Sequence, residues 1–119
     1  MALSAIETIE PGAAIDRGHL ARMTFGDRSL EQEVLQLFDR QSALLIARMR
    51  NGDGAAVGAL AHTLKGSAAG IGAGEVARAA DATERAAALS ATDLSATIDR
   101  LALAVDEARV LIAELLRDG

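Results

Sequence analysis

The sequence predicts an all-α fold, an antiparallel up-and-down four-helix bundle with a short additional N-terminal helix. Apolar residues recur at helical spacings of three and four in long segments, and short turns between these segments make neighbouring helices antiparallel. The chain of 119 residues is 50% hydrophobic but only 2% aromatic, which suits close packing of Leu, Ile, Val and Ala and gives strands little support. We expect a lead-in over residues 1–11 and one bundle domain over residues 12–119.

Two helices are expected in the first half of the chain. Asp16 is a suitable N-cap for a short helix that ends at about Met23. Ser29 and Gln32 resemble a capping box, which predicts a second helix over about 29–50. The apolar stripe of this helix would consist of Leu30, Val34, Leu37, Phe38, Leu44 and Leu45.

Three further helices are expected in the second half. Asp53, in an Asn-Gly-Asp-Gly turn, is the predicted N-cap of the third helix, which three glycines close: Gly70, Gly72 and Gly74. A fourth helix over about 74–89 would pack through Val76, Ala80, Ala87 and Leu89. Its charged residues would face water: Arg78, Asp81, Glu84 and Arg85. Thr92 would cap the last helix, which runs to about Arg117 with a seam of Leu94, Ile98, Leu101, Val105, Ala108, Ile112 and Leu115.

Composition excludes several classes of function. The net charge of −5 argues against nucleic acid as a partner, because phosphate binding needs a basic surface. The absence of Cys excludes disulfides, thiol catalysis and the usual structural zinc sites. No run approaches the roughly 20 apolar residues of a membrane span, and the N-terminus lacks the pattern of a signal peptide. We therefore expect a cytoplasmic protein that does not associate with membranes.

Catalytic equipment for phosphorylation is also missing from the sequence. There is no glycine-rich phosphate-binding loop of the GxxxxGK[ST] type and no carboxylate cluster spaced for Mg²⁺. We expect no metal site, no cofactor and no capacity to bind ATP and phosphorylate itself.

The most informative segment is residues 57–71, an amphipathic helix with one imidazole on its polar face. At about 100° per residue, Val57, Leu64 and Ile71 fall on one side, together with Leu60, and His62 points the opposite way. The residues around His62 are all small: Ala55, Gly58, Ala59, Gly66 and Ala69. A glycine inside a helix costs roughly 1 kcal/mol relative to alanine, so these glycines predict that another protein approaches His62 closely.

The run from Ala61 to Ala68, AHTLKGSA, followed by Ile71 and Gly72, resembles the signature of histidine-containing phosphotransfer (HPt) domains. These domains are intermediate carriers in two-component phosphorelays. The likeness is close over about 12 residues, and the order and lengths of the helices agree over residues 15–117. One departure is the Ala69-Gly70 pair, where many family members carry a polar residue.

The resemblance implies that His62 accepts a phosphoryl group from a receiver-domain aspartate and passes it to another receiver, which makes the chain a phosphocarrier rather than an enzyme. Mg²⁺ and most catalytic groups would come from the receiver. The residues support this chemistry independently, because an ordinary imidazole, with a pKa of about 6.5, is a competent nucleophile near pH 7. Lys65, one turn on, would offset phosphate charge, and Gly66 would leave room for the incoming loop.

Other residues receive secondary roles in this interpretation. Gln41 interrupts the apolar stripe of the second helix, and either an ordinary interhelical contact, which we favour, or a hydrogen bond near His62 would explain it. Ser67 lies on the flank and is expected to hydrogen-bond within or between helices. Receiver domains of response regulators and hybrid histidine kinases, the expected partners of this monomer, would dock on the third helix and on an apolar patch of Ile15, Leu20 and Met23.

Two other functions remain open from the sequence. A non-catalytic adaptor could bind and inhibit a receiver or kinase without carrying phosphate, and acid-labile phosphorylation would distinguish it from a carrier. A helical-bundle metal or haem protein would need carboxylates to join His19 and His62, and nothing in the sequence places these two residues together. We expect His19 to have a structural role.

Overall fold

The computed structural model describes residues 14–118, and within this range the secondary structure is entirely helical. The helices are α2 (Arg17–Met23), α3 (Arg28–Asn51), α4 (Gly54–Ile71), α5 (Gly74–Ala88) and α6 (Leu94–Asp118). The prediction of an all-α fold is therefore confirmed for the described residues. The lead-in predicted for residues 1–11 lies outside them.

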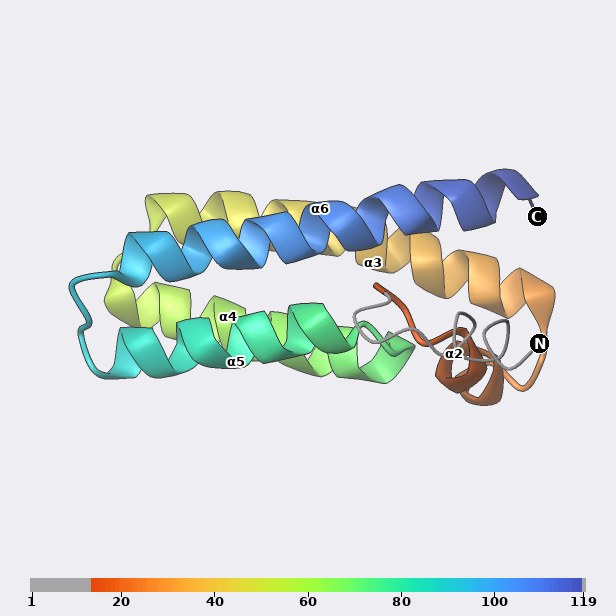
Figure 1. Cartoon of the computed structure of the whole chain (residues 1–119), viewed down its shortest axis with the longest axis horizontal. Helices are drawn as coiled ribbons and strands as arrows, with labels where there is room; N and C mark the ends of the chain where they lie inside the picture. Colours follow the sequence, from red (N-terminus) through yellow and green to blue (C-terminus); the bar gives the residue numbers. More distant parts are fainter. Residues whose placement is uncertain (1–13, 119) are drawn as a thin grey trace, which may run out of the picture.

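The four long helices lie side by side along the longest axis of the molecule (Figure 1). Successive long helices are joined at alternate ends of the bundle, and α2 lies at the end where α3 begins and α4 joins α5 (Figure 1). Backbone hydrogen bonding ties α2 to this end, because Asp16 N–H donates to the Gly72 carbonyl over 2.8 Å. The middle of α4 is thus left clear of the N-terminal helix.

Short polar side chains begin three of the helices. The side chains of Asp16 and Asp53 accept hydrogen bonds from backbone N–H groups of α2 and α4, which confirms both predicted N-caps. The predicted extent of α3, about 29–50, agrees with the structure, but the predicted cap at Ser29 was wrong: the N-cap is Asp27, which accepts from Leu30 N–H, and Ser29 lies inside the first turn. At the other end of α4, Gly72 adopts the left-handed conformation, with φ of 81°, that ends many helices.

The core lies between the four long helices and consists of aliphatic residues, one Phe and many alanines. Its fully buried members include Leu35, Met49, Val57, Ala61, Leu64, Ala68, Val76, Ala80, Leu101, Val105, Ala108 and Ile112. The seam predicted for α6 is confirmed, with Leu94 and Leu115 packed against its edge. Buried alanines let the helix axes approach closely, which is why so few aromatic residues are needed.

Three details of the predicted faces are wrong. Leu37 and Leu44 are exposed, and the buried face of α3 instead runs through Leu35 and Met49. Leu89 follows the last residue of α5 and is exposed. Thr92 is not the cap of α6, because that helix begins at Leu94. Of the described helices, none is both long and apolar enough to cross a membrane.

Candidate functional site

His62 lies near the middle of α4, on the side opposite the buried residues of that helix. Its side chain is 68% exposed, whereas Ala61 and Leu64 beside it are completely buried. The apolar face of α4 fixes this orientation, because rotation of the helix would expose the core. An exposed imidazole avoids the desolvation that a phosphorylated ring would suffer inside the protein.

A carboxylate from the neighbouring helix contacts the imidazole. Glu84 of α5 places Oε2 2.9 Å from His62 Nδ1, and its Oε1 accepts a hydrogen bond from Lys65 Nζ over 2.8 Å. One carboxylate therefore bridges the two polar side chains that the sequence singled out on α4. The side chain of Glu84 is 30% exposed, so solvent screens these interactions only in part.

Lys65 is held by a second carboxylate as well. Its Nζ donates to Asp81 Oδ1 over 3.2 Å, and Asp81 Oδ2 lies 2.6 Å from the Arg85 guanidinium. The hydrogen bonds from Lys65 lower the pKa of both Glu84 and Asp81, with His62 adding to the effect at Glu84, and the same bonds raise the pKa of Lys65. Both carboxyl groups are therefore ionised at neutral pH.

The sequence prediction missed Asp81 and Glu84, which it assigned to a solvent-facing surface with no partners. Outward-facing spacing on one helix does not reveal which neighbouring helix the side chains reach. A signal was nevertheless present in the register of the α4–α5 hairpin. His62 and Glu84 each lie eleven residues from Ala73 in the connection, and Lys65 and Asp81 each lie eight residues from it. Two antiparallel helices bring residues at equal distances from their connection to the same level.

A shallow cleft of about 580 Å³ adjoins His62 between α4 and α5. Its walls consist of Gly54, Ala55, Gly58, Ala59, His62, Thr63, Glu84, Ala87 and Ala88. A Cβ at Gly58 would lie 3.6 Å from the Ala87 Cβ, which is an ordinary contact across the helix interface, so close packing does not require glycine there. The small side chains in these walls thus leave one side of the imidazole uncovered.

Gly66 occupies a different environment from Gly58. A Cβ built on Gly66 would meet no atom within 4 Å, so nothing in the packing of the bundle requires glycine there. Ala69 is exposed on the same helix. Both residues leave α4 unobstructed on the C-terminal side of His62.

Gln41 and Ser67 contact each other between α3 and α4. The Ser67 hydroxyl donates to Gln41 Oε1 over 3.2 Å. This is the interhelical contact that we favoured for both residues from the sequence. The structure gives neither of them a hydrogen bond to His62.

The apolar docking patch predicted near the N-terminus needs correction. Ile15 and Leu20 are 2% and 1% exposed, because both pack into the core where α2 meets the bundle. Met23, at the end of α2, is 53% exposed, and Phe25 in the following turn is 90% exposed. The accessible apolar residues of this region are therefore Met23 and Phe25, of which the sequence analysis identified only the first.

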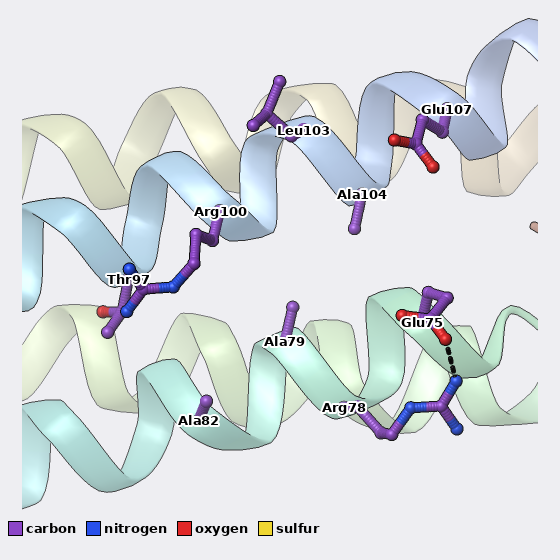
Figure 2. Close-up of a pocket in the computed structure, with 9 residues that line it drawn as sticks. All are labelled: Glu75, Arg78, Ala79, Ala82, Thr97, Arg100, Leu103, Ala104 and Glu107. Atoms are coloured by element: carbon purple, nitrogen blue, oxygen red, sulfur yellow. Dashed lines mark hydrogen bonds and ion pairs between the residues drawn. The ribbon is translucent and has the colours of Figure 1, made fainter. Parts of the chain in front are cut away.

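A second concavity, of about 480 Å³, lies between α5 and α6 (Figure 2). It combines Arg78, Arg100 and two glutamates with alanines, and Glu75 and Arg78 form an ion pair at one end (Figure 2). It shares no residue with the cleft beside His62. Among residues 14–118, no group of three or more His, Asp or Glu side chains is placed to hold a metal ion.

Comparison with known proteins gives one match. The family model described as the Hpt domain matches residues 28–117, which is more than half of the chain and includes all four long helices almost to their ends. No curated protein and no solved structure matches the chain.

Proposed function

The chain belongs to the Hpt domain family, whose members carry phosphoryl groups on histidine in two-component phosphorelays and interact with receiver domains. From this premise we propose that His62 accepts a phosphoryl group from the aspartyl phosphate of one receiver and passes it to another. The observation that carries the proposal is the exposure of the imidazole, 68%, within the matched residues. The protein acts as a carrier, and the receiver supplies Mg²⁺ and most catalytic groups.

The transfer exchanges one bond to phosphorus for another. An unprotonated ring nitrogen of His62 attacks phosphorus, the bond from phosphorus to the aspartyl oxygen breaks, and the aspartate leaves as a carboxylate with the electron pair. The reverse sequence delivers the phosphoryl group to the next receiver. Lys65 lies one turn from His62 and reduces the negative charge that the phosphoryl group meets from Glu84 and Asp81.

Access for the receiver is supported by the small residues around His62. Gly58 and Ala59 line the cleft on one side, and Gly66 and Ala69 keep the other side open. The docking surface comprises this face of α4 together with Met23 at the end of α2. Gln41 and Ser67 support it indirectly, by joining α3 to α4.

We further infer an up-and-down antiparallel bundle over residues 12–119 that acts as a monomer in the cytoplasm. Short connections between the long helices support the topology. A monomer suits the mechanism, because the site is formed by α4 and α5 of one chain.

Phosphotransfer from a panel of receiver domains tests the proposal. Each receiver, from a response regulator or a hybrid kinase, is charged with radiolabelled phosphate and mixed with this protein. We expect acid-labile label on this protein from at least one receiver, and its passage to a second receiver added later. Binding of receivers without any acid-labile label would contradict the proposal and identify an adaptor instead.

A further inference from the structure

We propose that Asp81 is a positioning residue for Lys65, which it holds back from the phosphoryl group on His62, and that it thereby makes the phosphorylated protein a better donor. The role builds on the proposed function, because it concerns the phosphorylated state of His62. Asp81 then determines how the phosphoryl group is divided at equilibrium between this protein and a receiver. The hold on Lys65 itself exists in the free protein and is measured without a partner.

Lys65 is the only lysine in the chain, and its ammonium group contacts two carboxylates of α5. Nζ donates over 2.8 Å to Glu84 and over 3.2 Å to Asp81. An ammonium group has three N–H donors, so the third has no acceptor among residues 14–118. A phosphoryl group on His62, one turn away, can accept this third N–H, but the charge of Lys65 is already shared between two carboxylates.

The two carboxylates differ in what else they contact. Glu84 places Oε2 2.9 Å from His62 Nδ1. Within the described residues Asp81 makes no hydrogen bond to His62, and its Oδ2 lies 2.6 Å from the Arg85 guanidinium. Asp81 lies one turn before Glu84 on α5, which places it at the level of Lys65. Asp81 therefore acts on the site through Lys65 and through its own charge.

Asp81 is a lasting charge in a fixed position. The hydrogen bond from Lys65 lowers its pKa, and the Arg85 guanidinium lowers it further, so the carboxyl group is ionised at neutral pH. Ala80, the residue before it, is completely buried in the core. A rotation of α5 that moved Asp81 away from Lys65 would expose Ala80, so the packing of the bundle maintains the contact.

Phosphorylation of His62 changes the charge balance around these groups. A phosphoryl group carries about two negative charges at neutral pH. Asp81 repels this charge directly, and it also binds the ammonium group that would otherwise act on the phosphoryl group alone. Both effects have the same sign, because both raise the free energy of phosphorylated His62 relative to the unphosphorylated residue.

A phosphorylated state of higher free energy donates more readily. In transfer to a receiver, the bond between phosphorus and the ring nitrogen of His62 breaks and its electron pair stays with the ring. An aspartyl carboxylate of the receiver supplies the electron pair of the new bond to phosphorus. The site that remains keeps the ion pairs of Asp81 with Lys65 and Arg85 at full strength. The charge of Asp81 therefore shifts the equilibrium toward the receiver.

NMR titration of Lys65 tests the hold in the free protein. Because the chain has no other lysine, the side-chain signals of Lys65 are identified directly. We expect a lower pKa for Lys65 in Asp81→Asn than in the wild type, since the amide keeps an acceptor at this position and removes only the charge. Glu75→Gln is the matched control, because it neutralises a carboxylate of the same helix at the concavity facing α6 and should leave this pKa unchanged. An unchanged pKa in Asp81→Asn would overturn the hold.

The equilibrium of phosphotransfer tests the role in donation. A receiver charged with radiolabelled phosphate is mixed with an equal amount of this protein, and the label on each is measured once their ratio no longer changes. We expect the ratio of label on this protein to label on the receiver to be about threefold higher in Asp81→Asn than in the wild type, which is the scale of partly exposed and screened charges. Asp81→Glu, which keeps the charge, and Glu75→Gln should divide the label as the wild type does.

The ratio at equilibrium distinguishes this role from a merely structural one. A variant that only docked less well would reach the same ratio more slowly, because docking changes neither end state. At about 1 M ionic strength, where charges are screened over roughly 3 Å, the difference between Asp81→Asn and wild type should shrink. A ratio that is unchanged in Asp81→Asn, or shifted toward the receiver, would overturn the role in donation. Failure of every receiver to label the wild type would instead contradict the proposed function, and the titration of Lys65 would then decide the hold alone.

Discussion

The two histidines of this chain lie on helices that touch, yet their surroundings differ in every respect that matters for phosphotransfer. His62 in the middle of α4 is largely exposed, with its Nδ1 at a carboxylate. His19 on α2 is partly buried, and its Nε2 donates to the Gly70 carbonyl over 3.2 Å. A carbonyl oxygen only accepts, so the Nε2 proton of His19 serves to hold α2 against the end of α4.

The backbone around each histidine shows the same contrast. Near His62, Gly66 has open space around it, so glycine there serves no packing need. Near His19, Gly72 is left-handed, and a Cβ on it would lie 2.9 Å from the Asp16 carbonyl oxygen and 3.3 Å from the His19 Cβ. One region is open and the other is closed, although each contains a histidine with a glycine nearby. Residue type alone does not distinguish the two histidines, whereas the exposure of each ring and its hydrogen-bond partner do.

The largest effect should come from exchanging each histidine for glutamine. In His62→Gln we expect acid-labile labelling by a charged receiver to fall to background, because the amide side chain lacks the nucleophilic ring nitrogen. In His19→Gln labelling should stay at the wild-type rate, since an amide N–H can still donate to the Gly70 carbonyl. Autoradiography measures the label. Labelling of His62→Gln at the wild-type rate would contradict the proposal that His62 accepts the phosphoryl group.

Alanine at Gly72 should have the next largest effect, and it acts on stability. The positive φ and the close approach to Asp16 must both be relieved, which costs about 1–3 kcal/mol in free energy of unfolding. The same change at Gly66 should instead stabilise the protein by about 0.5–1 kcal/mol, because alanine is the better helix former. Urea denaturation of both variants measures the difference, and equal effects would show that the two regions are not packed as described.

A larger side chain at Gly66 sharpens the contrast on the functional side. We expect Gly66→Met to fold normally and to accept phosphate about tenfold more slowly, because the side chain obstructs the receiver beside His62. Gly70→Met is the matched control, since Gly70 also has open space around it but lies about two turns from His62, one turn farther than Gly66. Transfer rates measured with the same charged receiver should fall only in Gly66→Met. Equal rates in the two variants would contradict the proposal that Gly66 leaves room for the receiver.

Much of the open region could be predicted from the sequence because its signals are local. The spacing of Val57, Leu64 and Ile71 determines which side of α4 faces the core, and His62 is then exposed by geometry. Asp53 and Gly72 mark the two ends of the same helix by their capping chemistry. None of this requires knowledge of the neighbouring helices.

The parts that sequence reasoning missed depend on how one helix meets another. On α3, apolar residues lie on more than one face, so periodicity did not separate buried Leu35 and Met49 from exposed Leu37 and Leu44. Ile15 and Leu20 have the apolar character of a docking patch, and only the position of α2 against α4 shows that they are buried. Glu84 likewise gains its meaning from the register of α5 against α4.

The smallest effect expected is that of removing Lys65, because the site contains other charged groups and solvent reaches it. In Lys65→Met, phosphotransfer should slow by about two- to fivefold, which is the scale of partly exposed ion pairs. Lys65→Arg should restore most of the rate, since the charge returns. An unchanged rate in Lys65→Met would leave Lys65 outside the mechanism.

The pH dependence of stability in Lys65→Met distinguishes the ion pairs around Lys65 from the steric contact at Gly72. Lys65 lowers the pKa of Glu84 and Asp81 below their ordinary values of 4.5 and 3.8, so the unfolded state binds protons first as the pH falls. Their contribution to stability is thus complete above about pH 4.5 and is lost as the pH falls through the lowered values. The pKa of Lys65 is raised above 10.5, so its own contribution is complete below that pH and is lost as the pH rises through the raised value.

Thermal unfolding at a series of pH values measures this. The difference in melting temperature between wild type and Lys65→Met should be largest between about pH 4.5 and 10.5 and should shrink in acid. Gly72→Ala should remain destabilised at every pH, because its defect is steric. A gap for Lys65→Met that stays constant into acid would mean that its carboxylate partners are not the source of its stabilisation.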